Sequence, residues 1–205
     1  GETEIKSART IDILRDYRSV FATAGIAAVV FMLMRAGRTV LVPIIGENYG
    51  LDAGVIGFIV SASALVDVLL FYPAGMAMDK YGRRFTAVPS AVLFTTGLLG
   101  LAFADNFISL LFWAIFLGLA NGLSTGIVMT LGTDHAPVGR RGEFLGVWRL
   151  ITDSGSTLGP LVVSGMLVFS PLFATTLAVG IFCGTGTLLI YRYVDETSEI
   201  VEVRK

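Results

Sequence analysis

The sequence predicts an all-α, polytopic membrane protein with six transmembrane helices. The chain has 205 residues, of which 54% are hydrophobic and 15% are charged, a composition too apolar for a soluble domain. The hydrophobic residues form six long runs, each with the roughly 20 residues that a helix needs to cross the hydrocarbon core. The basic residues gather in alternate connections between these runs. Because backbone groups in lipid must pair within their own segment, the runs are predicted to be helices.

The predicted domain organisation is a leader, a six-helix bundle and a tail. Residues 1–18 form a mixed-charge leader in which Ile11, Leu14 and Tyr17 recur at helical spacing, which indicates an amphipathic helix at the membrane surface. A solvated arm is the alternative. Residues 19–194 form the bundle, and residues 195–205 form a cytoplasmic tail. The six spans are predicted at residues 20–45, 53–78, 85–104, 107–131, 144–169 and 172–193.

The basic residues also predict the orientation of the spans. The leader, the second connection, the fourth connection and the tail hold all but three of the 15 Lys and Arg residues. The first, third and fifth connections hold none. By the positive-inside rule, both termini and the second connection face the cytoplasm. The sequence offers no basic surface for nucleic acid.

Arg192, counted with the tail, lies in the last turn of the sixth span. Five further charged residues lie within the predicted spans: Arg35, Arg38, Asp67, Arg149 and Asp153. A bare charge at the bilayer centre costs at least ~3 kcal/mol, so these side chains are expected to face protein or a water-filled cavity. Arg35, Asp67, Arg149 and Asp153 are therefore candidates for substrate binding or coupling. Arg38 lies nearer the outer surface and is expected to snorkel. The alternative is an ion pair that only fixes helix packing, and Arg149 with Asp153, four residues apart, is the best case.

Asp67 and Arg35 carry the sharpest hypotheses. Desolvation disfavours the charged form of a carboxyl at the bilayer centre, so Asp67 is the candidate proton-sensitive group. Arg35 lies deep in the first span and is predicted to face the cavity, where it would select an anionic or carboxylate-bearing substrate. Arg35 is also the expected cation for Asp67, and if the two side chains pair, both become structural.

Glycines mark where helices are expected to approach one another closely. The fourth span carries three of them at four-residue spacing, a pattern that lets helix backbones touch. The fifth span carries further glycines and a proline that removes one backbone hydrogen bond and should bend the helix. The residues assigned to packing and bending are Gly118, Gly122, Gly126, Gly146, Gly155, Gly159 and Pro160.

A short charged turn, Gly75-Met-Ala-Met-Asp79-Lys80-Tyr81-Gly82-Arg83-Arg84, separates the second and third spans. It resembles the signature loop of the major facilitator superfamily of secondary transporters. The resemblance implies that Asp79 docks on a helix end of an opposite half, while Arg83 pairs with Asp134 at the foot of the fourth span. The residues of the implied conformational latch are Gly75, Asp79, Lys80, Gly82, Arg83, Arg84 and Asp134.

The resemblance covers residues from about 10 to 198 and implies a six-helix half built from two inverted three-helix repeats. The fourth span has Asn121-Gly122, with Gly118 before it, where the N-terminal half of the family usually has Gln-Gly preceded by an Arg. This difference favours the C-terminal half. The fifth span only partly matches the family's antiporter motif, because Pro160 and two further residues are followed by Val163 and Ser164 where the family usually has Gly-Gly. A second six-helix half is expected as partner, whether covalently linked, on a separate chain, or a second copy of this chain.

The resemblance implies secondary active transport of a small molecule by alternating access, with proton-coupled export as one form. The alternative is a non-transporting membrane scaffold or assembly subunit built on the same half-fold. No enzyme activity, cofactor or metal is expected, because the single His135 lies beside Asp134 in a predicted cytoplasmic connection, where a solvated side chain is expected. The single Cys183 excludes a disulfide framework. The expected location is the lipid bilayer, which in a bacterium is the cytoplasmic membrane.

Overall fold

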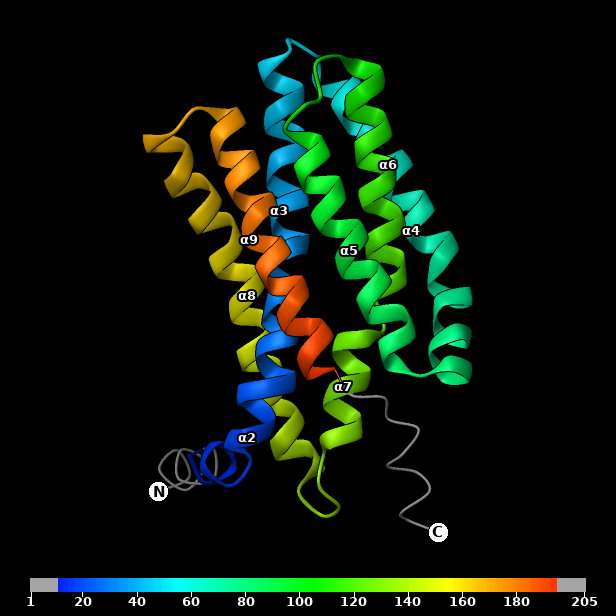
Figure 1. The fold of residues 1–205 in the computed structure, drawn as a ribbon, viewed down its shortest axis with the longest axis vertical. Helices are drawn as coiled ribbons and strands as arrows, with labels where there is room; N and C mark the ends of the chain where they lie inside the picture. The colour runs from blue at the N-terminus through cyan, green and yellow to red at the C-terminus, as the bar shows by residue number, and fades with distance from the viewer. Residues whose placement is uncertain (1–10, 195–205) are drawn as a thin grey trace.

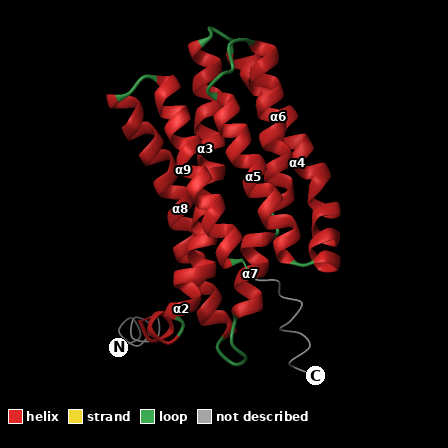
Figure 2. Ribbon diagram, viewed as in Figure 1, coloured by secondary structure: helices red, strands yellow, loops and turns green. Residues whose placement is uncertain are grey.

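The computed structural model of the chain describes residues 11–194, and this part consists of helices and turns without a strand (Figure 2). Residues 11–16 are helical, and α2 (Arg18–Val20) continues through the π-helix η1 (Phe21–Gly25) into α3 (Ile26–Asn48). The other helices are α4 (Ala53–Tyr81), α5 (Arg83–Leu101), α6 (Phe107–Ser124), α7 (Ile127–His135), α8 (Arg141–Phe169) and α9 (Leu172–Tyr193). The predicted tail and the first half of the leader lie outside the described residues.

Five segments are long and apolar enough to cross a membrane: Arg18–Asn48, Ala53–Tyr81, Arg83–Leu101, Phe107–His135 and Leu172–Arg192. The protein is therefore an all-α, multi-pass integral membrane protein. The sixth predicted span is α8, which has 29 residues but is not among the five, because it carries Arg149, Asp153 and several hydroxyl side chains. At 1.5 Å per residue it is ~44 Å long, and it packs along α3. Its length and packing, rather than its composition, support it as a span.

The helices pack as two interlocked sets of three. The chief contacts join α4 to α6, α5 to α9, α3 to α8 and α5 to α6, so each of α3, α4 and α5 meets at least one helix of the second set, which consists of α6 with α7, α8 and α9. This exchange of partners is the pattern expected of two inverted three-helix repeats. Helices α4 and α8 lie at opposite edges of the bundle in the view of Figure 1. Only four of the 29 residues of α4 are buried, so this helix leaves most of its surface uncovered within the described chain.

The connections fall into two groups at the two ends of the bundle. The α4–α5 and α7–α8 connections, the start of α2 and the end of α9 lie at one end in Figure 1, and the α3–α4, α5–α6 and α8–α9 connections lie at the other. The first group holds the basic residues and the second holds none. That this basic end faces the cytoplasm remains a prediction.

The second half of the leader is helical, and its contacts with the bundle are made by Ile13, which lies outside the predicted stripe, and by Tyr17, which belongs to it. Ile13 is fully buried, whereas Ile11 and Leu14 are exposed. The ring of Tyr17 meets that of Phe144 at 5.4 Å between centroids. Tyr17 thus fixes the leader to the first turn of α8, while Ile11 and Leu14 remain exposed, and the place of the leader at the membrane surface stays a prediction.

Close contacts between helices occur at most of the predicted glycines. A Cβ on Gly118 would lie 2.4 Å from the backbone oxygen of Ser63, and one on Gly122 would lie 2.8 Å from that of Asp67. A Cβ on Gly126 would lie 3.1 Å from the Met78 side chain. A Cβ on Gly155 would lie 2.9 Å from a backbone oxygen of α3, and a Cβ on Gly159 would lie 2.3 Å from a side chain of α3. The assignment of Gly146 to helix packing is wrong, because nothing lies within 4 Å of its position. Helix α8 continues unbroken through Pro160.

Candidate functional site

The fourth span is interrupted in its middle, between α6 and α7. The Ser124 hydroxyl donates to the backbone oxygen of Asn121 at 3.0 Å, and the Thr125 hydroxyl donates to the same oxygen at 2.8 Å. Hydroxyls that bond a carbonyl three or four residues back weaken the helical ladder and bend helices. The helix resumes after Gly126. Polar atoms are therefore available at a depth where an apolar helix would present none.

Charged side chains from α3 and α4 converge on this interruption. Arg35 donates from Nη2 to the Ser124 hydroxyl at 3.0 Å. Asp67 accepts a hydrogen bond from the Asn121 amide and another from the Thr125 hydroxyl at 3.3 Å. Ser124 thus binds the Arg35 guanidinium, while Asn121 and Thr125 bind the Asp67 carboxylate.

Arg38 is the cation closest to Asp67, which corrects two predictions. Its Nη1 lies 3.8 Å from Oδ2 of Asp67, and its Nη2 donates to the Ser63 hydroxyl at 2.8 Å. The Arg38 side chain is only 14% exposed and that of Asp67 21%, so Arg38 does not snorkel to the surface. One turn of α3 separates Arg38 from Arg35, so both can reach the α4–α6 pair. Pairing with Asp67 satisfies the guanidinium inside the protein, which removes the reason to snorkel.

The cluster carries more positive than negative charge. Arg35 and Arg38 are both present, and Asp67 is the carboxylate they share. The Nε atom of Arg35 is buried and has no hydrogen-bond partner among residues 11–194. A buried donor without a partner is costly, since it has lost water and gained nothing in exchange. The arrangement therefore has capacity for one additional anion or acceptor.

A cavity of about 390 Å³ opens beside the cluster. This volume falls within the usual range for small-molecule sites. Its lining includes the guanidinium-bearing Arg38 but not Arg35, so Arg35 does not line this cavity, and its place at a substrate cavity between two bundles stays a prediction. The lining residues are Arg38, Thr39, Val42, Pro43, Val60, Ser63, Asp67 and Asn121.

Arg149 and Asp153 lie apart from the cluster, on the outer face of α8. Their closest charged atoms are 4.0 Å apart, and the side chains are 72% and 62% exposed. The pair therefore does not join the other predicted candidates, and at this separation and exposure it contributes little to stability. Ser154, Ser156 and Thr157 are exposed beside it, which gives α8 a polar face that is unsuited to lipid.

The signature loop is held by an ion pair between α5 and the end of α7. Arg83 donates to Oδ2 of Asp134 at 2.9 Å and to Oδ1 at 3.4 Å, and both side chains are 20% exposed. Asp79 lies 3.6 Å from Arg83 but is 77% exposed, so its carboxylate is open to other partners. Gly82 between the helices has φ +90°, a conformation that other residues rarely adopt. His135 follows within α7, where its Nδ1 lies 2.8 Å from the oxygen of Leu131, so it is not the solvated loop residue predicted.

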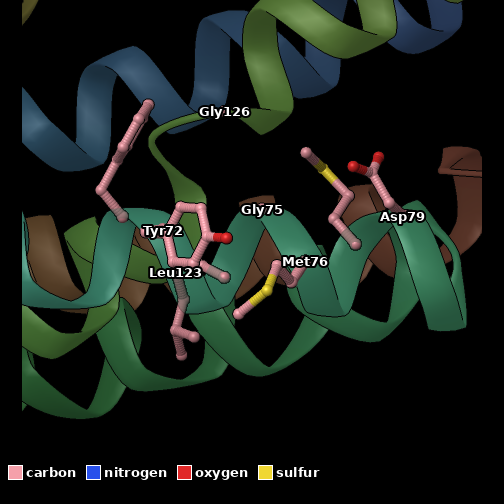
Figure 3. Close-up of a pocket in the computed structure, with 9 residues that line it drawn as sticks. Tyr72, Gly75, Met76, Asp79, Leu123 and Gly126 are labelled. Carbon is pink, nitrogen blue, oxygen red and sulfur yellow. The ribbon is translucent and has the colours of Figure 1, made fainter.

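A second cavity, of about 280 Å³, lies beside this loop. Figure 3 shows Tyr72, Gly75, Met76 and Asp79 along α4, with Leu123 from the last turn of α6 and Gly126 from the interruption of the fourth span. Apart from neighbouring backbone, no atom of residues 11–194 lies within 4 Å of a Cβ placed on Gly75, and this residue adds no side chain to the wall of the cavity. The same interruption therefore borders both the polar cluster and the loop.

Sequence reasoning identified the charged members of the cluster but not the residues that organise them. Ser63, Ser124 and Thr125 were missed, and Asn121 was noted only for its place in a motif. A signal was available, because Ser63 lies one turn before Asp67, and Asn121, Ser124 and Thr125 lie at i, i+3 and i+4 in an otherwise apolar run. Polar residues on one helical face within a span indicate a polar partner.

Six long helices, a charged cluster at an interrupted span and a basic signature loop define the class of polytopic membrane transport proteins. The chain belongs to the Major Facilitator Superfamily, whose family model matches residues 24–204. It is 29% identical over 171 residues to the multi-drug resistance efflux pump PmrA of Streptococcus pneumoniae, which covers 80% of this chain and 42% of the pump.

Two further relatives are named for sugars or sugar acids. The hexuronate transporter of Bacillus subtilis is 27% identical over 154 residues, covering 75% of this chain and 35% of the relative. The D-xylose transporter of Levilactobacillus brevis is 33% identical over 102 residues, covering 50% of this chain and 22% of the relative. The chain spans less than half the length of these curated relatives.

Proposed function

We propose that this chain forms one six-helix bundle of a secondary transporter, which moves a small molecule across the membrane by alternating access. The observation that carries the proposal is the charged cluster at the interrupted fourth span, next to a cavity of about 390 Å³. Charged side chains at this depth cost free energy, and their presence therefore points to a role in binding or coupling. Interrupted spans offer the free polar groups from which transporter sites are built. A second six-helix bundle would complete the pathway opposite α4 and α8.

The substrate class that fits the cluster is a small anion, such as a molecule with one carboxylate. Arg38 lines the cavity, and Arg35 and Arg38 together exceed the charge of Asp67. A planar guanidinium binds carboxylate oxygens through paired N–H groups. The relative named as a hexuronate transporter supports this choice, because a hexuronate is a sugar that bears a carboxylate. Arg35 acts in this proposal as a positioning residue, which fixes Ser124 at the interruption.

Proton coupling extends the proposal through Asp67. In the described conformation Asp67 contacts Arg38 and accepts from Asn121 and Thr125. When Asp67 accepts a proton, it loses its charge and its ion pair with Arg38. The substrate anion then binds the Arg38 guanidinium in place of Asp67. Export is the direction favoured by the relatives named as efflux pumps or multidrug resistance proteins.

The signature loop acts in the proposal as a latch at the basic end of the bundle. The Arg83–Asp134 ion pair ties α5 to α7, and α7 starts at the interruption that holds the charged cluster. Asp79, exposed beside the second cavity, is free to dock on the opposite bundle when this end closes. The ion pair and the interruption together offer a physical route from the charged cluster to the latch.

The test is transport by proteoliposomes that contain the protein as its genome encodes it, so that any second bundle is included. Radiolabelled glucuronate, D-xylose and the dye ethidium serve as probes, because they represent the substrate and pump classes for which the relatives are named. We expect glucuronate transport to fall at least tenfold in Arg38→Gln and to persist in Arg141→Gln, a matched control at an exposed base in the first turn of α8. Transport of none of the probes, or equal loss in both variants, would contradict the proposal.

A further inference from the structure

One corner of the basic end combines unpaired positive charge with exposed aromatic rings. The residues of this α4–α5–α9 corner are Lys80, Tyr81, Arg84, Phe85 and Tyr191. The Arg84 guanidinium carbon lies 4.4 Å above the ring centroid of Tyr191, which joins α5 to α9. Lys80 lies 5.0 Å from the ring centroid of Tyr81, and that ring packs on Phe85 at 4.9 Å. The corner is therefore a built surface formed by three helices.

The two bases of this corner have no acidic partner among residues 11–194, unlike Arg83 and Arg140 at the same end of the bundle. Arg83 is matched by Asp134 and Asp79, and Arg140 is matched by Asp16 and Glu143. No acidic group among residues 11–194 lies within ion-pair distance of Lys80 or Arg84. Both bases rest on aromatic rings instead. The five residues of the corner thus carry two positive charges and no negative one.

The corner lies where a bilayer would present its headgroups. Helix α4 has 29 residues and is ~44 Å long, so its ends pass beyond a hydrocarbon core of ~30 Å. Tyr81, Phe85 and Tyr191 are between 52% and 56% exposed, and they lie at this end of the bundle. Aromatic side chains favour the boundary between hydrocarbon and headgroups. Basic side chains beside them attract anionic headgroups, at about 1 kcal/mol for each Lys or Arg.

We propose that the α4–α5–α9 corner binds the phosphate group of an anionic phospholipid. Stacking on Tyr191 fixes the plane of the Arg84 guanidinium and leaves N–H groups at its edge for phosphate oxygens. Lys80 supplies a second positive charge on the other side of Gly82. The exposed faces of Tyr81 and Phe85 offer a surface for the acyl chains. A free phosphate would gain the charge contacts but not this apolar contact.

The test uses the purified 205-residue chain in neutral detergent, titrated and followed by native mass spectrometry. The probes are dioleoylphosphatidylglycerol, dioleoylphosphatidylcholine and glycerol 3-phosphate, which separate an anionic lipid, a zwitterionic lipid and a free headgroup. Because each base contributes about fivefold, we expect phosphatidylglycerol to bind at least fivefold more tightly than phosphatidylcholine. Arg84→Gln should weaken phosphatidylglycerol about fivefold and leave phosphatidylcholine unchanged. Tyr191→Leu keeps the charge but removes the platform, and should weaken phosphatidylglycerol about threefold.

Arg141→Gln is the matched control, because Arg141 is exposed at the same end of the bundle but stacks on no ring. We expect this variant to keep the affinity for phosphatidylglycerol. Equal losses in Arg84→Gln and Arg141→Gln would show general charge attraction and overturn the site. Binding of glycerol 3-phosphate as tight as that of the lipid, with the same loss in Arg84→Gln, would assign the corner to a soluble phosphate instead. If Tyr191→Leu elutes as an aggregate, the Arg84→Gln result decides alone, since it changes one side chain at the protein surface.

Discussion

Replacing Asp67 by Asn should destabilise the bundle far more than the same change at Asp153. Both are acids within predicted spans, but Asp67 lies 3.8 Å from Arg38 in a largely buried cluster, whereas Asp153 is 62% exposed. Removing one partner of a buried ion pair costs about 3–5 kcal/mol. Because the cavity leaves some water access, we expect about 3 kcal/mol for Asp67→Asn. For Asp153→Asn we expect at most about 0.5 kcal/mol, as for an exposed pair.

The assay is equilibrium unfolding of the purified protein in detergent micelles, followed by the fluorescence of its two Trp residues. A double-mutant cycle with Arg38→Gln isolates the pair from the general cost of each change. We expect the double variant to lose about 1–2 kcal/mol less than the two single losses combined, since it leaves no unpaired charge at that position. Equal losses for Asp67→Asn and Asp153→Asn, or a strictly additive cycle, would refute the assignment of Asp67 to a buried network.

Two further predictions concern helix packing and the latch. Gly118→Ala should destabilise the protein by about 1–3 kcal/mol, because its Cβ would lie 2.4 Å from the backbone of α4. Gly146→Ala should be neutral or stabilising, because its Cβ would meet no atom of residues 11–194 within 4 Å. Equal melting temperatures of the two variants would contradict this prediction. Asp79→Asn should shift the inward/outward population about tenfold, because the charge-assisted hydrogen bond it would lose contributes about 1.5–3 kcal/mol. Maleimide accessibility of cysteines on the two membrane faces measures this shift. The control is Asp105→Asn, which removes a carboxylate at the opposite end of the bundle. If Asp79→Asn and Asp105→Asn give the same accessibility pattern, the latch is excluded.

The sequence predicted the class of fold and most of its spans because both depend on hydropathy. The sixth span was predicted at residues 172–193 and is the helix Leu172–Tyr193. The second was predicted to end at residue 78, but α4 continues to Tyr81, since its charged last turn remains helical until Gly82 turns the chain. The interruption at residues 125–126 was not predicted, because hydropathy is blind to hydroxyls that bond backbone carbonyls.

The candidate site was predicted less completely than the fold. Burial cost alone marks which spans contain charges, but the rotation of each helix decides which side chains meet. For this reason Arg38, rather than Arg35, became the partner of Asp67, and the Arg149–Asp153 pair fell on an outer face. The contact between Arg83 and Asp134, 51 residues apart, came from the family resemblance and not from spacing. Its role as a latch remains a proposal.

The measurement that tests the central claim most directly is substrate protection of a cysteine in the cavity wall. Thr39 lines the cavity and is exposed, and its hydroxyl bonds only a carbonyl of its own helix, so Thr39→Cys should fold normally. In a Cys183→Ala background this is the only cysteine of the 205 residues, and any cysteine of a second bundle is replaced by Ala as well. We predict that glucuronate slows its labelling by a water-soluble maleimide in proteoliposomes, that D-xylose does not, and that Arg38→Gln abolishes the protection. Labelling that glucuronate leaves unchanged, or protection that survives Arg38→Gln, would contradict an anion site at this cluster.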